Sequence, residues 1–295
     1  MGDDIQTLID KSSTKTITNT IGKKPTQEEL LAKAKNFDIC SPQHKSIFLF
    51  GAAKTGKTWC YMPIIDEVIS QGGHVHLIST DAGFVETFRA YFKERTQEVS
   101  KHITPYMISE LEQLYSVTKE IRSNVFSSKS RNLIVIDLIS SFYEMSQAKF
   151  IDDSSGGDFV NFIIRASHDN SKFGMFEGKM WQYIKKMDEY IRQQLIIPPI
   201  CDVIAIGTEK DIDVEKKITK KVAHIYDVTG AKPGGAKELP YDFNTFIYVN
   251  KASGKRFFQV LGHRGVDLDP YERHEFERDF WSKFKEVIGE NNATK

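Results

Sequence analysis

Gly51-Ala52-Ala53-Lys54-Thr55-Gly56-Lys57-Thr58 matches the phosphate-binding loop pattern G-x-x-x-x-G-K-[ST] at every fixed position. The apolar run at 46–50 predicts a buried strand directly before it, and the stretch from 59 onward predicts a helix. A strand, a glycine-bounded turn and a helix N-terminus form a cradle of N–H groups for an anion. We therefore expect these eight residues to bind the phosphates of a nucleoside triphosphate, with Lys57 at the β and γ phosphates and Thr58 on Mg²⁺.

Length, composition and charge limit the class of protein. The chain has 295 residues, 40% hydrophobic and 12% aromatic, which is enough for one large α/β domain. Its 40 basic and 40 acidic residues cancel, so any binding to nucleic acid must come from local patches. The three cysteines form no C-x-x-C pair, and no signal peptide or membrane-spanning run is visible. We expect a cytoplasmic protein (host cytoplasm if viral) with no membrane partner.

The chain divides into three expected regions. Residues 1–45 read as a polar arm with a short helix, 46–266 as the domain that carries the phosphate loop, and 267–295 as a C-terminal helix. Apolar runs predict strands at 46–50, 74–79, 133–136, 203–206, 243–249 and 256–261. Helices are expected at 57–70 with a kink at Pro63, at 84–120, at 179–195 and at 271–288, and a loop at 152–158.

Continuous apolar strands that alternate with helices predict a mostly parallel sheet covered on both faces. The connection between the last two strands is too short for a crossover, so we expect them to form an antiparallel hairpin. The fold class is therefore α/β. A ligand of such a sheet binds at the carboxyl ends of the strands.

Polar residues follow several of these strands. Asp137, after four apolar residues, has the position of a Walker B acid that binds Mg²⁺ through water beside Thr58. Asp81 is the candidate for orienting the attacking water, and capping of the next helix is an equally good explanation of it. Thr208 and Glu209 have the position of a polar γ-phosphate sensor. Arg264 is the candidate for a charge-neutralising finger, in cis or from a neighbouring subunit. With Lys251, Lys255 and Arg256 it surrounds the final hairpin, where the alternative is a solvated basic rim.

Three further patterns were weighed. Thr208-Glu209-Lys210-Asp211 has its lysine one place late for a GTPase motif, which favours ATP as the nucleotide. His74 and His76 share one face of a strand, but without an evident third ligand they are expected to be core or rim histidines. The aromatic residues of 173–183 alternate with lysines, which suits single-stranded nucleic acid, although packing of the aromatic rings on the sheet is preferred.

The order of these motifs resembles that of RecA-like P-loop ATPases, and it is similar to the phage and archaeal-virus proteins of the single-strand annealing and recombination group. The resemblance rests on FLFGAAKTGKT, HLISTDAGF, NLIVIDLISSFYEM and DVIAIGTEKD, and extends from Ile47 to about Arg264. It implies that the 203–206 strand lies between those at 46–50 and 133–136. It also implies Mg²⁺-dependent ATP hydrolysis, a ring or filament of identical subunits, single-stranded DNA as a partner, and Asp81 as the water-activating acid.

Two other functions remain open from the sequence. One is a nucleotide-gated assembly or regulatory module that hydrolyses ATP poorly and binds no DNA. The other, placed last, is a small-molecule kinase, because such kinases usually begin close to the phosphate loop and carry an arginine-rich lid.

Overall fold

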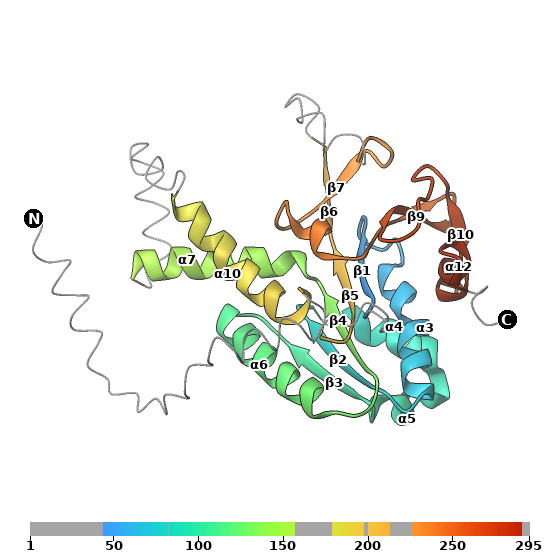
Figure 1. Cartoon of the computed structure of the whole chain (residues 1–295), viewed down its shortest axis with the longest axis horizontal. Coiled ribbons are helices and arrows are strands. Elements are labelled where there is room, and N and C mark those ends of the chain that lie inside the picture. Colours follow the sequence, from blue (N-terminus) through green and yellow to red (C-terminus); the bar gives the residue numbers. More distant parts are fainter. Residues whose placement is uncertain (1–43, 82, 157–178, 198–199, 213–225, 291–295) are drawn as a thin grey trace, which may run out of the picture. The chain divides into compact units, whose positions relative to one another are not determined.

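The computed structural model describes residues 44–81, 83–156, 179–197, 200–212 and 226–290 (Figure 1). The polar arm expected at 1–45 lies almost wholly outside this part of the chain, as do Pro198 and Pro199. The three-region division therefore stays a prediction.

An eight-stranded sheet forms the centre of the described domain. Its order is β10-β9-β8-β1-β5-β4-β2-β3. The strands are β1 (Ser46–Phe50), β2 (His74–Ser79), β3 (Ile103–Met107), β4 (Asn132–Asp137), β5 (Asp202–Gly207), β8 (Thr245–Ala252), β9 (Lys255–His263) and β10 (His274–Phe276). From β3 to β8 neighbouring strands are parallel, whereas β8, β9 and β10 pair antiparallel. The predicted fold class is confirmed, and so is the position of β5 between β1 and β4.

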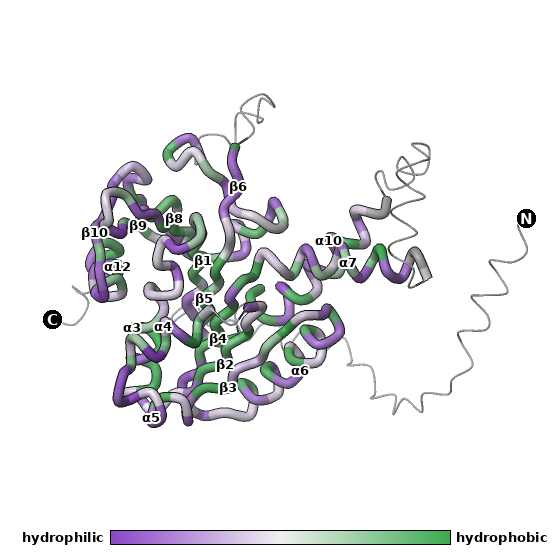
Figure 2. The backbone as a smooth tube through the Cα atoms, turned by 180° about the vertical axis from the view of Figure 1, so that it is seen from behind, coloured by the Kyte–Doolittle hydropathy of each residue, from purple (hydrophilic) through white to green (hydrophobic). Residues whose placement is uncertain are grey.

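Helices cover both faces of this sheet (Figure 1). On one face lie α3 (Lys57–Ser70), α4 (Gly83–Phe92), α5 (Thr96–Ser100) and α12 (Phe280–Val287). On the other lie α6 (Leu111–Ser127), α7 (Ser140–Ser155) and α10 (Lys179–Leu195). Successive side chains of a strand pack into the cores on opposite faces of the sheet, as Leu49 and Phe50 do in β1. Figure 2 shows the central strands as almost continuously apolar, which is typical of parallel strands buried on both faces.

Shorter elements connect the main ones. A 3₁₀ turn, η1 (Lys93–Arg95), joins α4 to α5, and η3 (Leu239–Asp242) precedes β8. A two-stranded antiparallel ribbon of β6 (Glu209–Asp211) and β7 (Ala231–Pro233) extends from the carboxyl end of β5. Within the described residues, none of the helices combines the length and the apolar character needed to cross a membrane.

Three expectations about local structure were wrong. The single helix at 84–120 is instead α4, η1, α5, β3 and the start of α6. Strand β3 contains Pro105, which an edge strand tolerates because its outer N–H groups need no partner. The helix at 271–288 begins only at Phe280, after the short strand β10. Residues 152–155 belong to α7 rather than to a loop. Pro63 lies inside α3, as expected, and the kink there stays a prediction.

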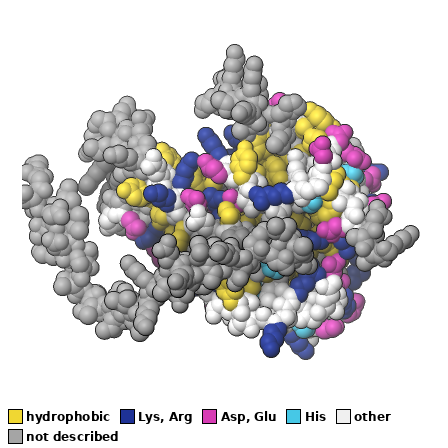
Figure 3. Space-filling view, in the orientation of Figure 1, with side chains coloured by type: hydrophobic (Ala, Val, Ile, Leu, Met, Phe, Trp, Pro, Cys, Tyr) yellow, Lys and Arg dark blue, Asp and Glu magenta, His cyan; other side chains and the backbone are white. Residues whose placement is uncertain are grey.

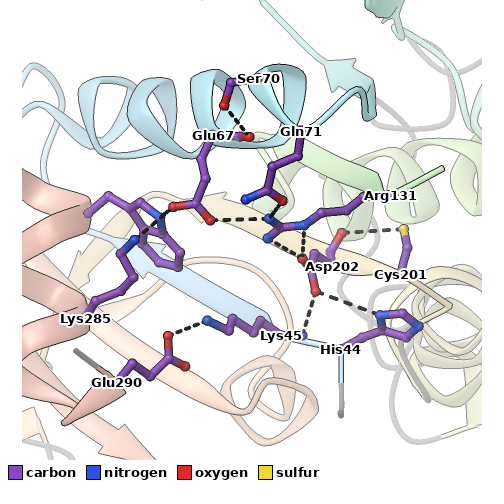
Figure 4. A network of polar contacts seen from close by, with 11 residues as sticks. His44, Lys45, Glu67, Ser70, Gln71, Arg131, Cys201, Asp202, Lys285 and Glu290 are labelled. Atoms are coloured by element: carbon purple, nitrogen blue, oxygen red, sulfur yellow. Dashed lines mark hydrogen bonds and ion pairs between the residues drawn. The ribbon is translucent and has the colours of Figure 1, made fainter. Parts of the chain in front are cut away.

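A polar network fixes the amino ends of the central strands (Figure 4). Arg131, just before β4, donates two hydrogen bonds to Asp202 at the start of β5 and one to Glu67 of α3. Glu67 also accepts from Lys285 and Trp281 of α12. Burial raises the pKa of the Asp202 carboxyl, but hydrogen bonds from Arg131 and other donors outweigh it, so the pKa falls to about 2. The network ties the C-terminal helix to the sheet at the edge away from the strands' carboxyl ends.

Candidate functional site

The loop at 51–58 lies at the carboxyl end of β1 and leads directly into α3, as the sequence predicts. Gly51 is packed against β8 so closely that an added Cβ would lie 2.0 Å from the carbonyl oxygen of Val249. Gly56 has φ 101° and Lys54 has φ 63°, so the backbone turns through the left-handed region twice. The first turn of α3 then presents free N–H groups beside this curve, which is a cradle for phosphate.

Replacing Gly51 with alanine is expected to lower the free energy of unfolding by about 3 kcal/mol, because the methyl group has no space against β8. Gly254, in the β8–β9 turn, offers a matched control with φ 82° and open space around it. Alanine there should cost only about 1 kcal/mol. Urea unfolding of both variants tests this, and equal losses would contradict the steric explanation.

Lys57 is buried, and its ammonium group turns back onto the loop. Its Nζ donates hydrogen bonds to the carbonyl oxygens of Gly51 (2.7 Å) and Ala52 (2.6 Å). Burial lowers the pKa of Lys57, and the nearby charges of Asp137 and Glu209 oppose this. The lysine is therefore held at the mouth of the cradle, where its charge can neutralise a bound phosphate.

Asp137 ends β4 and is buried beside the loop. Tyr61 donates a hydrogen bond to its Oδ2 at 3.1 Å, and the Thr58 hydroxyl lies close enough to lower the pKa of the carboxyl. Burial raises the pKa of Asp137 to about 6, with the charge of Asp81 adding to the effect and Tyr61, Lys57 and Thr58 reducing it. A buried carboxylate that is costly to ionise is suited to a divalent cation, which favours its charged form.

The donor set fits Mg²⁺. Thr58 and Asp137 are oxygen ligands that lie close together, and Mg²⁺ bound to a nucleotide takes its remaining ligands from phosphates and water. Among the described residues no group of three His, Cys, Asp or Glu side chains could hold a metal by itself. A Mg²⁺ site made of Thr58, Asp137 and the nucleotide phosphates does not require such a group of three side chains.

Asp81 follows β2, on the same edge of the sheet. Its Oδ1 accepts a hydrogen bond of 2.7 Å from the backbone N–H of Gly83, in the first turn of α4. Its charge raises the pKa of both Asp137 and Tyr61, so it lies within electrostatic reach of the metal ligands. The structure thus brings Asp81 to the site and also gives it the helix-capping contact that the sequence offered as the alternative.

Thr208 follows β5 and belongs to a chain of hydroxyl groups across the strand ends. Its backbone N–H and its Oγ1 lie 3.4 and 3.3 Å from Ser140 Oγ. Ser141 contacts Thr80 Oγ1 at 3.3 Å, and Thr80 Oγ1 accepts from the N–H of Leu138 at 3.2 Å. These contacts connect the ends of β2, β4 and β5, so Thr208 is positioned beside the segment that follows Asp137.

Arg264 lies at the opposite edge of the sheet. It follows β9, whose His263 pairs with Thr245 at the amino end of β8, and its Nη2 donates to the Tyr241 carbonyl oxygen at 2.9 Å. Within one chain the structure does not bring Arg264 to the phosphate loop. Its role as a finger supplied by a neighbouring subunit stays a prediction. At the other end of the hairpin, Lys251, Lys255 and Arg256 lie on the loop's edge of the sheet.

The histidine pair of β2 occupies the core and rim of the sheet. His74 Nε2 contacts Thr104 Oγ1 at 2.9 Å, whereas His76 is buried and stacks on Tyr106. In the described part of the chain neither ring nitrogen of His76 has a hydrogen-bond partner. Burial, with the charge of His74, lowers the pKa of His76 to about 4. The two rings therefore do not form a metal site with any third ligand among the described residues.

His76 predicts a loss of stability in mild acid. Its folded pKa lies below the ordinary 6.5, so the unfolded chain takes up the proton first as pH falls. Stability should fall between pH 6.5 and 4 by up to about 3 kcal/mol and then level off for this group. The variant His76→Phe keeps the ring and removes the titration. Urea unfolding at several pH values should give a flatter curve for this variant, and parallel curves would contradict the prediction.

The aromatic residues of α10 do not all pack inward, contrary to the preferred expectation. The buried side of α10 consists of Ile184, Asp188, Ile191, Arg192 and Leu195. Trp181 and Tyr183 are 44% and 61% exposed. Phe173 and Phe176 lie outside the described residues.

One residue of the site, Tyr61, was not predicted from the sequence, whereas Glu209 was expected beside Thr208 as a polar residue near the γ phosphate. Tyr61 stands one helical turn after Lys57, so the i, i+4 spacing could have placed it on the same face. Glu209 contacts the Tyr248 hydroxyl and raises its pKa, burial being the larger cause, and it also faces Lys57. Its position depends on the pairing of β6 with β7, for which the local sequence gave no strong pattern.

The fold and this site together define an α/β protein with a phosphate-binding loop and an adjoining carboxylate–hydroxyl pair. No family model matches the chain, and no curated protein matches it. Among solved structures, the crystal structure of the RadB recombinase is similar to it, with a TM-score of 0.43 and 14% sequence identity. The alignment covers 79% of this chain and 91% of that chain. At this similarity, the properties of that recombinase say nothing about the activity of this chain.

Proposed function

We propose that this protein binds and hydrolyses ATP in a Mg²⁺-dependent manner, as a RecA-like ATPase in DNA recombination or replication. The observation that supports it most is the convergence of Lys57 and the Thr58–Asp137 pair on one glycine-bounded loop. The loop's N–H groups and Lys57 bind the phosphates. Thr58 and Asp137 hold Mg²⁺, which neutralises charge on the phosphate oxygens.

Hydrolysis also requires a group that orients the attacking water. Asp81 is proposed for this task, because its charge reaches Asp137 and it lies on the same edge of the sheet. Thr208, held beside Ser140, is proposed as the sensor of the γ phosphate. Arg264 is proposed to act on the site of a neighbouring subunit in a ring or filament.

Single-stranded DNA is the proposed partner. The exposed rings of Trp181 and Tyr183 are followed on α10 by the exposed Lys186 and by Lys185, which pairs with Glu238 at 3.0 Å. Bases stack on exposed aromatic rings, and lysines pair with phosphates. Figure 3 shows that Lys and Arg side chains on the visible face are interspersed with acidic ones. DNA binding would therefore depend on local stacking more than on a general positive field. The narrower placement among viral proteins rests on the order of the sequence motifs.

A second function is favoured by the contact of Asp81 with Gly83. A short carboxylate engaged by a backbone N–H is poorly placed to activate water unless that bond breaks. In this alternative the protein is a nucleotide-gated assembly or regulatory module with little hydrolysis and no direct DNA contact.

ATP turnover with Mg²⁺, measured with and without single-stranded DNA, tests the proposal. The Lys57→Ala variant serves as the control that removes the phosphate-binding charge. Turnover that rises with DNA and disappears in the control would support the ATPase. Tight ATP binding without turnover in either condition would favour the gated module, and an absence of ATP binding would refute both.

Asp81→Ala separates the two functions further. In an ATPase it should abolish turnover and leave ATP binding within about threefold of the parent. If turnover persists in this variant, Asp81 is a helix cap and another group positions the water.

A further inference from the structure

Arg256 projects from the start of β9 onto the first turn of α3. Its side chain packs against Gly56 so closely that a Cβ there would lie 2.6 Å from Arg256 Cδ and 2.8 Å from its Nε. The guanidinium carbon lies 5.6 Å from the centre of the Trp59 ring. The arginine therefore reaches the phosphate loop from the C-terminal hairpin of the same chain.

The charge of Arg256 has no counter-ion in the described part of the protein. Its Nε is buried and has no hydrogen-bond partner, and no carboxylate among these residues forms an ion pair with the guanidinium. Glu275, beside it in a hollow of about 280 Å³, is paired with Lys255 at 2.9 Å. An unpaired guanidinium held against a cradle of N–H groups is a binding site for an anion.

Arg256 and the metal ligands make different contacts around the loop. Lys57, Thr58, Tyr61 and Asp137 interact with one another, and they are the residues proposed to bind the β and γ phosphates and Mg²⁺. Arg256 instead contacts Gly56 and Trp59, and its charge acts on Cys60. The N–H groups of such a loop also hold the α phosphate. The α phosphate is the one that Lys57 and the Mg²⁺ ligands do not bind.

We propose that Arg256 binds the α phosphate of the nucleotide in cis, with the Trp59 ring holding its guanidinium in place. This inference rests on the proposed binding of ATP. It adds to the phosphate-binding loop a phosphate-binding residue from β9, a strand that is distant from the loop in sequence. Because ADP and ATP share the α phosphate, the contact contributes to both.

The test is calorimetric titration of Arg256→Gln with MgATP and MgADP. Both affinities should fall about 30-fold, the size expected for one charge-assisted phosphate contact. Arg278→Gln is the matched control, because Arg278 lies 5.5 Å over the same Trp59 ring and is exposed. Its affinities should stay within about threefold of the parent.

Several results would overturn the inference. An unchanged affinity in Arg256→Gln, a loss confined to ATP, or an equal loss in Arg278→Gln would each do so. Arg256→Lys keeps the charge and should recover part of the affinity, which remains informative if the glutamine variant fails to fold. If the parent protein binds neither nucleotide, the proposed function itself fails. That result is distinct from a parent that binds both and an Arg256 variant that is unaffected.

Discussion

Asp137→Asn is expected to reduce Mg²⁺-dependent ATP turnover at least about 100-fold and, at the same time, to stabilise the nucleotide-free protein. Turnover falls because the amide cannot supply the negative charge that holds the metal beside Thr58. Stability rises because a buried carboxylate that is unfavourable to ionise is replaced by a neutral group able to accept the bond from Tyr61.

The stabilising effect should depend on pH in a defined way. The folded pKa of about 6 lies above the ordinary value of 3.8, so the folded protein keeps its proton to higher pH than the unfolded chain. Stability from this group is therefore present below pH 3.8 and is lost as pH rises through 6, a cost of about 2 to 3 kcal/mol above that pH. The gain from Asp137→Asn should be largest at pH 8 and small near pH 4.

Urea unfolding at pH 8 and pH 4, beside steady-state turnover, measures both effects. Asp211→Asn is the control, since it changes an exposed carboxylate on β6 and should alter neither property. A variant of Asp137 that is destabilised at pH 8, or that retains turnover, would refute the assignment of this residue.

Arg192→Ala should cost about 3 to 5 kcal/mol of stability, the range for breaking a buried ion pair. Arg192 Nε lies 2.8 Å from Asp188 Oδ2, both side chains are at most 5% exposed, and the guanidinium also pairs with Asp242. Removing the arginine leaves two carboxylates buried without their partner. Burial already raises the pKa of Asp188, and Arg192 is the first of the groups that oppose this.

An exposed ion pair of similar composition provides the comparison. Arg95 bonds to Asp66 at 2.9 Å, but both side chains are well exposed, and Arg95→Ala should cost less than about 1 kcal/mol. Thermal and urea unfolding of the two variants would show the difference directly. Similar losses would mean that burial of the Arg192 cluster contributes little.

The phosphate loop, the strand before it and Asp137 at the end of β4 could be predicted because each is a local sequence pattern. The octapeptide specifies its own turn, and apolar runs around Asp137 specify a buried parallel strand. By contrast, β3 was hidden within an expected helix, since five residues with a proline gain their strand conformation only by pairing with β2. The approach of Arg256 to Gly56 could not be predicted either, because it depends on the register of β8 with both β1 and β9.

The close fit of Gly51 against Val249 makes the loop and the C-terminal hairpin a single mechanical unit. There is no spare volume between them, so a movement of the loop on that side displaces the backbone of β8. Lys57 must leave the carbonyl oxygens of Gly51 and Ala52 to reach a phosphate, which frees the same stretch of backbone. Binding of a phosphate that draws Lys57 away from these carbonyl groups is therefore coupled to the backbone of β8.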